Sequence, residues 1–373
     1  MINGFCAYCG ESSWAIHARY FFDALDKREE VRIASWNGPP PGLAPGSRPA
    51  FGRPILSNPS VGFGPIEHVS KIVGSRRIAL VLWETTIMPV ENVRMLRGMD
   101  EVWTLSNWGR QILINNGVDS EKVGVVPAGV DVQKFRPLPR EREARPFRLL
   151  SVGKWEARKG TEDLIRAYCT EFHPDEPVEL VLHCSNPFVN GFDLEANIRR
   201  IAGDRHPEIV ASPPVTLGGL VDLYNSCDAF VLPTRAEGWG LPITEAMACG
   251  LPVIVTNYSA PADYLSQELA YLIPVEGLVP VYDPDFFPQG STCGEWAQPD
   301  LGILSRLMRH VFEHPAEARK KAELARLEVC SRWTWDHAAA KALRLLRGQH
   351  ETVPSSQNAT GLPSFYTEPQ TSI

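Results

Sequence analysis

Two glutamates flank a glycine-rich turn in EGWGLPITEAMACG, the stretch that runs from Glu237 to Gly250. Pro242 suits a first helical turn and Gly250 suits the position just after a helix end, so the spacing predicts a loop that closes into a helix. Glu245 would then lie in the first turn of that helix. The free amide hydrogens and the positive dipole end of such a turn can bind an anion such as phosphate.

The composition favours a two-domain α/β protein. The chain has 373 residues and is 44% hydrophobic, which is enough for a core in each of two ordinary domains. A net charge of -7 with scattered basic residues gives no field that attracts nucleic acid. No apolar run approaches a membrane span of roughly 20 residues, and the N-terminus lacks a signal-like pattern. We therefore expect a cytoplasmic location.

The cysteines do not indicate a disulfide framework. Eight of them are scattered along the chain, which is typical of reduced thiols. Cys6 and Cys9 form a C-x-x-C before a predicted helix, where a redox pair could lie. No second pair has the spacing of a zinc site, so a metal site is not expected.

Short apolar runs alternate with helical patterns along most of the chain, which predicts parallel strands joined by crossover helices. The proline-rich stretch 39–54 is predicted to be an irregular loop. Residues 134–145, rich in charge and proline, are predicted to be an exposed connector. We expect one Rossmann-like domain over 1–138 and a second over 139–332. We also expect a helix over 333–347 that can pack back on the first domain, and a disordered tail over 348–373.

Three segments carry a resemblance to a known family: VVPAGVDVQKFRP, SVGKWEARKGTEDLIRAY, and the stretch from residue 220 to 265 that contains both glutamates. Together they resemble the retaining glycosyltransferases of the GT-B fold, specifically glycosyltransferase family 4. The resemblance covers roughly residues 100 to 345. It implies two Rossmann-like, doubly wound domains that face a central cleft.

The resemblance implies that the C-terminal domain binds a nucleotide sugar. Glu245 would hold the ribose hydroxyls, since a carboxylate can accept two hydroxyl hydrogens at once. Glu237 would meet the sugar and the diphosphate. Other donor contacts would come from the turn between the two acids, at Gly238, Trp239, Gly240 and Leu241.

The resemblance also implies that basic side chains, without a metal or cofactor, neutralise the leaving diphosphate. Lys154 and Lys159 bracket the loop KWEARKG, where the family usually has an arginine and a lysine. Lysine at 154 is a departure, because it offers a point charge in place of a planar fork. The plainer alternative is that both are solvated loop lysines.

The first domain carries weaker signals. Gly10, Ser12 and Ser13 precede a predicted helix, where the family has a loop near the phosphates, although the serines could simply cap the helix. Glu84 stands where the family often has a histidine that touches the transferred sugar. We count Glu84 with Glu237, Lys154 and Lys159 as the expected catalytic residues.

Other side chains of this kind have plain structural interpretations. His17 and His68 are weak substitutes for the missing histidine, since a lone histidine is more often structural or solvent exposed. The indoles of Trp14, Trp83 and Trp108 could stack on an acceptor sugar, but burial in the core explains each as well. The Asp-x-Asp in YDPDF, residues 282–286, is interpreted as a turn and not as a metal site.

The predicted function is transfer of a sugar, with retention, from a UDP- or GDP-linked donor to a saccharide or other hydroxyl-bearing acceptor. One alternative is a scaffold that binds a nucleotide sugar without catalysis. Another is a glycoside hydrolase that uses Glu237 and Glu245 as acid and base, which would need the two carboxyl groups about 5 to 10 Å apart. Peripheral contact with a membrane is left open.

Overall fold

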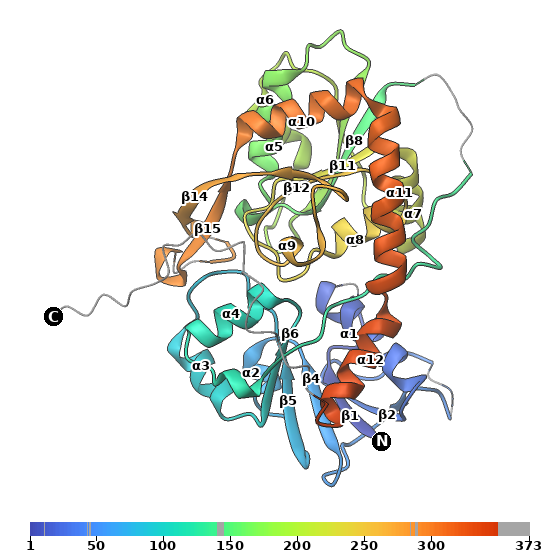
Figure 1. Cartoon of the computed structure of the whole chain (residues 1–373), viewed down its shortest axis with the longest axis vertical. Coiled ribbons are helices and arrows are strands. Elements are labelled where there is room, and N and C mark those ends of the chain that lie inside the picture. The colour runs from blue at the N-terminus through green and yellow to red at the C-terminus, as the bar shows by residue number, and fades with distance from the viewer. Residues whose placement is uncertain are drawn as a thin grey trace, which may run out of the picture.

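The computed structural model describes residues 1–10, 12–42, 44, 46–139, 145–283, 285–287 and 290–349. The chain forms two α/β lobes stacked along the long axis of the molecule (Figure 1). The N-terminal lobe is drawn in blue to cyan, and the C-terminal lobe in green to orange. The expected tail beyond residue 349 lies outside the described residues.

The N-terminal lobe is built on a parallel sheet of seven strands in the order β3-β2-β1-β4-β5-β6-β7. Its strands are β1 (Ile2–Cys6), β2 (Val31–Ser35), β3 (Ala50–Phe51), β4 (Pro59–Phe63), β5 (Arg76–Leu80), β6 (Glu101–Thr104) and β7 (Val123–Val125). Its helices are α1 (Ser13–Asp26), α2 (Ile66–Val69), α3 (Val90–Arg97) and α4 (Asn107–Asn115), followed by the 3-10 turn η1 (Ser120–Lys122).

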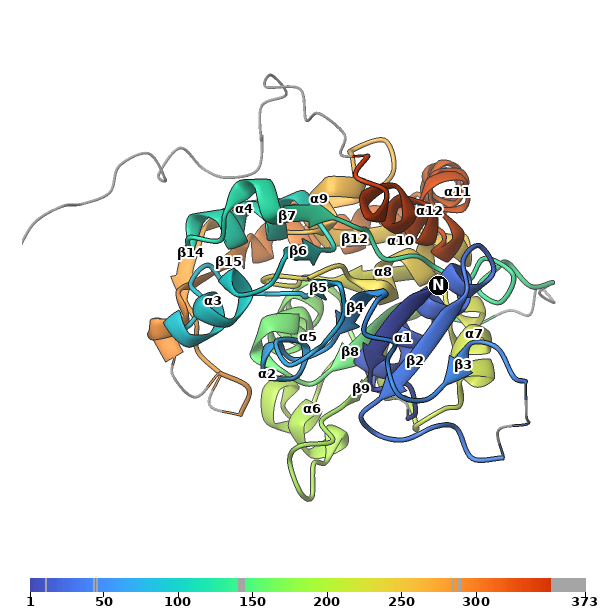
Figure 2. The ribbon, with the colours of Figure 1, turned by 90° about the horizontal axis from the view of Figure 1, so that it is seen from below.

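Helices cover both faces of this sheet. Alternate residues of β5 point to opposite sides: Ile78 and Leu80 pack with α1, whereas Ala79 packs with α2 and α3. Figure 2 shows this layering from below. All pairings between strands are parallel, so the carboxyl ends of the strands meet at one edge of the lobe.

The sequence analysis missed two strands of this lobe. Strand β3 lies inside the proline-rich stretch that was predicted to be irregular throughout, and β4 follows it. Strand β4 begins at Pro59 and contains Gly62, both unfavourable in a strand interior. Tertiary packing explains the glycine, because a Cβ at Gly62 would lie 3.1 Å from Ile72 and 3.2 Å from Val69.

The C-terminal lobe has a parallel sheet of six strands in the order β10-β9-β8-β11-β12-β13. Its strands are β8 (Phe147–Lys154), β9 (Val178–Ser185), β10 (Ile209–Ala211), β11 (Ala229–Leu232), β12 (Val253–Thr256) and β13 (Tyr271–Ile273). Its connecting elements are η2 (Ala157–Lys159), α5 (Thr161–Glu171), α6 (Leu194–Ala202), α7 (Leu217–Ser226), α8 (Leu241–Ala248) and α9 (Pro261–Tyr264).

An antiparallel hairpin that the sequence did not predict joins the two lobes. It consists of β14 (Val275–Pro280) and β15 (Glu295–Pro299), with the short turn η3 (Gly290–Cys293) between them. The indole nitrogen of Trp296 donates to the backbone oxygen of Glu84 at 2.8 Å, and the amide of Glu295 donates to the hydroxyl of Thr86, also at 2.8 Å. The hairpin therefore fixes the loop that follows β5 of the other lobe.

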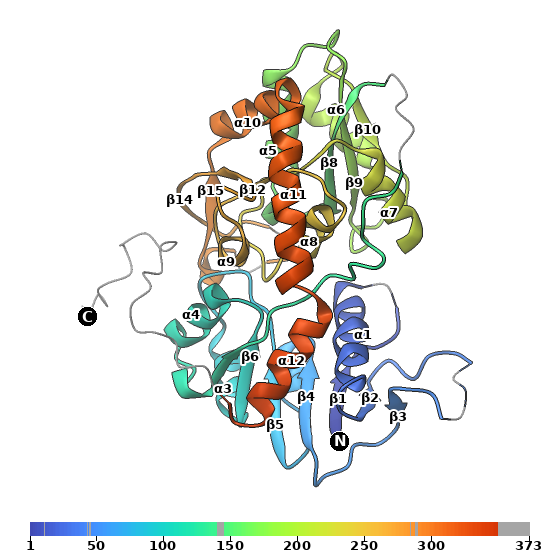
Figure 3. The same ribbon diagram turned by 45° about the vertical axis from the view of Figure 1, so that its right-hand side comes forward.

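Three helices end the described chain: α10 (Leu301–Glu313), α11 (Pro315–Arg332) and α12 (Trp335–Leu346). Helix α11 runs down the C-terminal lobe, and α12 continues onto the N-terminal lobe beside α1 (Figure 3). The ring of Trp335 stacks on that of Tyr20 with centroids 5.6 Å apart. We propose the division of the chain given above, with residues 333–347 as the segment that returns to the first lobe.

No helix within the described ranges combines the length and the apolar character needed to cross a membrane.

Candidate active site

A cleft of about 390 Å³ lies between the carboxyl ends of the two sheets and is lined by both lobes. Parallel α/β sheets bind ligands in this position, because the loops that follow the strands converge there. The expected site residues that line the cleft are Glu84, Lys154, Lys159, Glu237, Trp239, Gly240, Leu241 and Glu245. The structure thus brings most of the predicted site together, although the two halves of it are far apart in sequence.

The loop and helix predicted from Glu237 to Gly250 exist, but the expected place of Glu245 was wrong. Gly240 caps α8 in the left-handed conformation with φ of 92°, Pro242 is in the first turn, and Gly250 follows the end of the helix with φ of 77°. Glu245 is the fifth residue of α8, one turn further than predicted. This position puts Glu245 on the same face of α8 as Leu241, and both residues line the cleft.

Glu245 lines the cleft with its side chain partly buried. Burial raises the pKa of its carboxyl from 4.5 to about 7, although the hydroxyl of Tyr224, which donates to Glu245 Oε2 at 2.9 Å, partly opposes this effect. A carboxyl group in this state is poised to ionise when a ligand supplies further hydrogen-bond donors.

Glu237 is buried and ionised. Its Oε1 accepts hydrogen bonds from Lys159 Nζ at 2.6 Å and from the hydroxyl of Thr234 at 2.9 Å. Burial would raise the pKa of Glu237, but Lys159 and Arg158 outweigh that effect and lower it. The amide of Glu237 is held by the hydroxyl of Ser259 at 2.8 Å, so the backbone of the turn is fixed as well.

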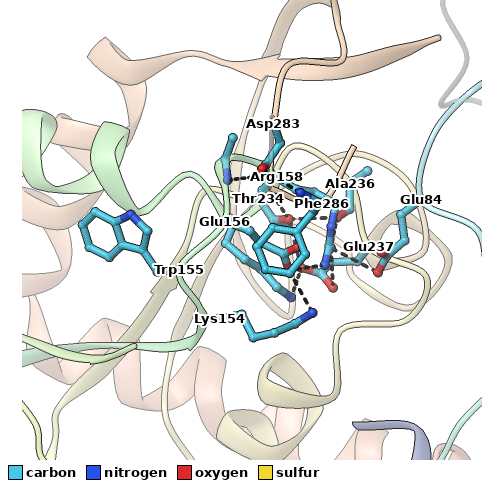
Figure 4. A network of polar contacts seen from close by, with 12 residues as sticks. Glu84, Lys154, Trp155, Glu156, Arg158, Thr234, Ala236, Glu237, Asp283 and Phe286 are labelled. Atoms are coloured by element: carbon cyan, nitrogen blue, oxygen red, sulfur yellow. Dashed lines mark hydrogen bonds and ion pairs between the residues drawn. The ribbon is translucent and has the colours of Figure 1, made fainter. Parts of the chain in front are cut away.

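The sequence analysis missed Arg158, which is the centre of the charged network (Figure 4). Its side chain is buried, and its guanidinium pairs with Glu156 at 2.7 Å, Glu84 at 3.2 Å and Glu237 at 3.3 Å. Burial alone would lower the pKa of Arg158, but these three carboxylates raise it well above its usual range. Its Nε has no hydrogen-bond partner within the described chain. The loop KWEARKG thus contains an arginine beside Lys159, although position 154 is a lysine.

Glu84 reaches the cleft from the loop after β5 and is the N-terminal lobe's member of this network. Its side chain is 23% exposed, and it pairs with Arg158 of the other lobe. Burial raises the pKa of Glu84, with smaller raising contributions from Glu156 and Glu237, and Arg158 only partly opposes the rise.

Lys154 also lines the cleft, but its ammonium pairs with Glu156, whereas that of Lys159 pairs with Glu237. Lys154 is the last residue of β8, and its Nζ lies 3.8 Å from Glu156 and 4.8 Å from the ring centre of Phe286. Figure 4 shows its ammonium below the network, whereas Arg158 points into it. The two lysines therefore have different surroundings, and only Lys159 is buried.

The turn between the acids packs tightly against both lobes. A Cβ at Gly238 would lie 3.0 Å from Leu82 of the N-terminal lobe, and one at Gly240 would lie 2.8 Å from Ile243. The indole of Trp239 is buried against Tyr264 and Trp333, with centroids 4.8 and 5.4 Å away. Its side chain serves the core, which leaves mainly the backbone of the turn to face a ligand.

Of the two serines in the loop after β1, one caps the helix and the other lines the cleft. The hydroxyl of Ser12 caps α1 by accepting from the amide of Ala15 at 3.2 Å, whereas Ser13 lines the cleft. Gly10 is exposed, has φ of 102° and is not among the described residues that line the cleft.

Only some of the aromatic residues considered for acceptor binding lie at the cleft. Trp14 and His17 line it, but neither Trp83 nor Trp108 is among its described lining residues. His68 stacks on Trp36, with ring centres 5.2 Å apart, away from the lining.

The motif YDPDF follows β14 and contains an acid that organises loops. Both oxygens of Asp283 accept backbone hydrogens, from Ala157 at 2.8 Å and from Asp285 and Phe286 at 3.1 Å. Asp283 thus holds the loop that carries Arg158 and Lys159. The structure shows no group of three or more potential metal-ligating side chains in the part of the chain that it describes.

Two partners of the expected acids had faint signals in the sequence. Arg158 stands beside Lys159 in KWEARKG, and Tyr224 lies on the helix just before β11. Neither could be assigned without the fold, because their contacts join residues 79 and 21 positions apart.

Comparison with known proteins agrees with the fold and places the chain in a family. Two solved structures match it along nearly their whole length. Sucrose-phosphate synthase from Thermosynechococcus elongatus is 17% identical with a TM-score of 0.67, and the match covers 93% of this chain and 98% of that chain. Anabaena HepE in complex with UDP-glucose is 14% identical with a TM-score of 0.68, covering 93% and 100%. The predicted GT-B fold is thereby confirmed.

The curated relatives are glycosyltransferases that match only part of the chain. D-inositol 3-phosphate glycosyltransferase of Pseudarthrobacter chlorophenolicus is 29% identical over 163 residues, which are 41% of this chain and 38% of the relative. A GDP-mannose-dependent phosphatidylinositol monomannoside mannosyltransferase of Corynebacterium glutamicum is 23% identical over 60% of this chain and 56% of its own length.

The model of one family, described as Family 4 Glycosyltransferase in conflict systems, matches residues 104–342. This range contains the loop with Arg158 and Lys159, the turn from Glu237 to Gly240, and Glu245. The chain therefore belongs to this glycosyltransferase family.

Proposed function

We propose that this protein transfers a sugar from a nucleoside diphosphate sugar, UDP- or GDP-linked, to an acceptor hydroxyl with retention and without a metal ion. The observation that carries the proposal is the buried cluster of Lys159, Arg158 and Glu237 on the same cleft wall as Glu245. Each part of such a donor has a matching group in the cleft. The two cations suit the diphosphate, Glu237 suits the transferred sugar, and Glu245 on the following helix suits the ribose.

The cations would act on the leaving group. Lys159 and Arg158 lie close enough together to contact one carboxylate, so they converge on a small volume. Negative charge that develops on a departing diphosphate would be stabilised there by groups that are already oriented. Lys154, at the more open side of the cleft, would add a weaker long-range attraction.

The two acids would orient the donor. Glu245 would accept the ribose hydroxyls, and this contact would favour its ionised form. Glu237, held ionised, would accept hydroxyls of the transferred sugar. Glu84 would contact the same sugar from the other lobe. The resemblance implies front-face attack, in which the departing phosphate oxygen takes the acceptor proton, and the protein then contributes positioning and exclusion of water.

The surroundings of Glu237 argue against a glycoside hydrolase. A general base works best when its pKa lies near the operating pH, whereas Lys159 and Arg158 lower the pKa of Glu237. In this structure, Lys159 and Thr234 occupy one oxygen of Glu237, and Arg158 lies 3.3 Å from the other. Such a carboxylate is better suited to binding than to proton transfer.

We also propose a cytoplasmic location for the reaction. The structure has its eight cysteines as thiols and not as disulfides, which suits a reducing compartment.

A direct test has two steps. A thermal-shift screen with UDP, GDP, ADP and their sugars would identify the carrier, because a ligand that binds the folded state raises its apparent stability. Turnover of the labelled nucleotide sugar would then be compared among wild type, Lys159→Ala, Glu245→Ala and the exposed control Lys320→Ala. Binding without any turnover would favour the scaffold, and release of sugar from an oligosaccharide without nucleotide would favour the hydrolase.

A further inference from the structure

The two walls of the cleft differ in charge. The C-terminal wall carries Lys154, Arg158 and Lys159 with two carboxylates. The described residues of the N-terminal wall include no cation and only one carboxylate, Glu84. The remaining side chains of that wall are Ser13, Trp14, Ile16, His17, Phe63, Leu82 and Leu105.

His17 is the unusual member of this wall. Its side chain stacks on Phe63 with ring centres 4.0 Å apart, and its edge meets Trp335 at 4.8 Å. The residue is only 3% exposed, yet it lines the cleft, and its imidazole forms no hydrogen bond within the described chain. Its ring nitrogens are not among the fully buried side-chain atoms that lack a partner, so they keep some access to the cleft and can form a hydrogen bond with a ligand there.

A purely structural role would not need an imidazole. The rings around it are aromatic, and an apolar side chain would pack against them without ring nitrogens that need a partner. Burial also lowers the pKa of His17 to about 3, so the ring is neutral and is a poor base. A neutral imidazole can still donate a hydrogen bond to a hydroxyl through one nitrogen or accept one through the other.

We propose that the acceptor is an uncharged molecule that lays an apolar face, such as the C–H face of a sugar ring, on this wall and hydrogen-bonds a hydroxyl to His17. Trp14 packs against Phe63 at 5.0 Å and extends the apolar surface. A phosphorylated acceptor would meet no cation on this wall and would be repelled by Glu84. The inference deepens the proposed function and rests on it.

This acceptor class differs from the one named in several relatives. The curated relatives called D-inositol 3-phosphate glycosyltransferases bear a phosphate in their named substrate. Their alignment covers about two-fifths of this chain, so the similarity leaves the acceptor open.

The acceptor class is tested with matched pairs of probes: myo-inositol against D-myo-inositol 3-phosphate, and glucose against glucose 6-phosphate. Wild-type enzyme and the labelled nucleotide sugar that it turns over are incubated with each probe. We expect transfer to an uncharged member at least about tenfold faster than to its phosphorylated partner. Preference for a phosphorylated member overturns the proposal, as does donor turnover without transfer to either uncharged probe.

The role of His17 is tested with His17→Phe, His17→Asn and the control His68→Phe. The phenylalanine variant should keep the KM for the donor and lose about tenfold in kcat/KM for the uncharged acceptor. Asparagine should restore part of that loss, because it returns a hydrogen-bonding group. Transfer by His17→Phe at the wild-type rate overturns the assignment while leaving the proposed function intact. A wild-type protein that neither binds nor turns over any nucleotide sugar refutes the proposed function, and this inference with it.

Discussion

The guanidinium of Arg158 lies 3.2 Å from the carboxylate of Glu84, and the two side chains belong to different lobes. The same guanidinium also reaches Glu156 and Glu237 of its own lobe. One buried cation therefore serves two purposes: it compensates three acids, and it links the lobes at the point where the proposed donor would lie. This arrangement makes Arg158 the residue on which both stability and activity should depend most.

Arg158→Met should destabilise the protein by about 3 to 5 kcal/mol, because it leaves buried carboxylates without their cation. Chemical denaturation measures the effect. The same substitution in a Glu84→Gln background should cost at least about 1 kcal/mol less, since one of the uncompensated acids is then neutral. An equal loss in both backgrounds would show that the contact between the lobes carries no energy.

Lys159→Ala should weaken binding of a nucleoside diphosphate far more than binding of the free nucleoside, because the lost partner is phosphate. We expect a loss of about 1.5 to 3 kcal/mol for the diphosphate, measured by titration calorimetry. Lys154→Ala should lose less, since the Lys154 side chain is 39% exposed and its ammonium lies away from Glu237. Lys320→Ala provides the control for a general charge effect. Equal losses for nucleoside and nucleoside diphosphate would remove Lys159 from the phosphate site.

Stability should depend on pH through Glu245. Its folded-state pKa of about 7 lies above its ordinary value of 4.5, so the folded state holds this proton more tightly than the unfolded chain does. The resulting stabilisation is complete below about pH 4.5 and is lost as the pH rises to about 7. Glu245→Gln keeps a neutral side chain, so it should be more stable than wild type at pH 8 by about 1 to 3 kcal/mol.

Denaturation curves at pH 5 and pH 8 check this expectation, and Tyr224→Phe offers a companion variant. Removing the hydroxyl that donates to Glu245 should raise the pKa further and move the pH dependence upward. A Glu245→Gln variant with the same difference from wild type at both pH values would mean that this carboxyl does not titrate in the range.

Gly240→Ala should lower both stability and donor binding. A Cβ there would lie 2.8 Å from Ile243 and 3.0 Å from Tyr264 Oη, in addition to the strain of φ at 92°. Gly191→Ala is the control, because Gly191 also has a positive φ, of 73°, and no atom within 4 Å of an added Cβ. Positive φ alone costs about 1 kcal/mol, so the excess loss at Gly240 in thermal denaturation measures the clash. Equal losses would show that the turn can move aside.

The α/β architecture could be predicted from the sequence because buried parallel strands have a strong local signature. Strand β11 (Ala229–Leu232) and strand β12 (Val253–Thr256) are continuous apolar runs beside turn residues. Strands β3 and β4 lack that signature, since one has two residues and the other begins with proline and contains glycine. The hairpin of β14 and β15 was missed because its first strand is half-exposed and its second strand is held by the N-terminal lobe, through Trp296 and the backbone of Glu84.

The candidate site likewise has features that a local sequence pattern predicts and features that only tertiary packing sets. The sequence by itself determined the spacing of Glu237 and Glu245, the turn between them and the nearby lysines, because these features lie within short stretches with strong backbone preferences. Only the tertiary structure decided that Arg158 joins Glu84 to Glu237, that Lys154 stands apart, and that His17 faces the cleft. Those relations depend on which loops meet when two sheets are stacked, and on burial, which sets the charge state of each group. A local pattern of residues contains neither the loops that will meet nor the extent to which each group will be buried.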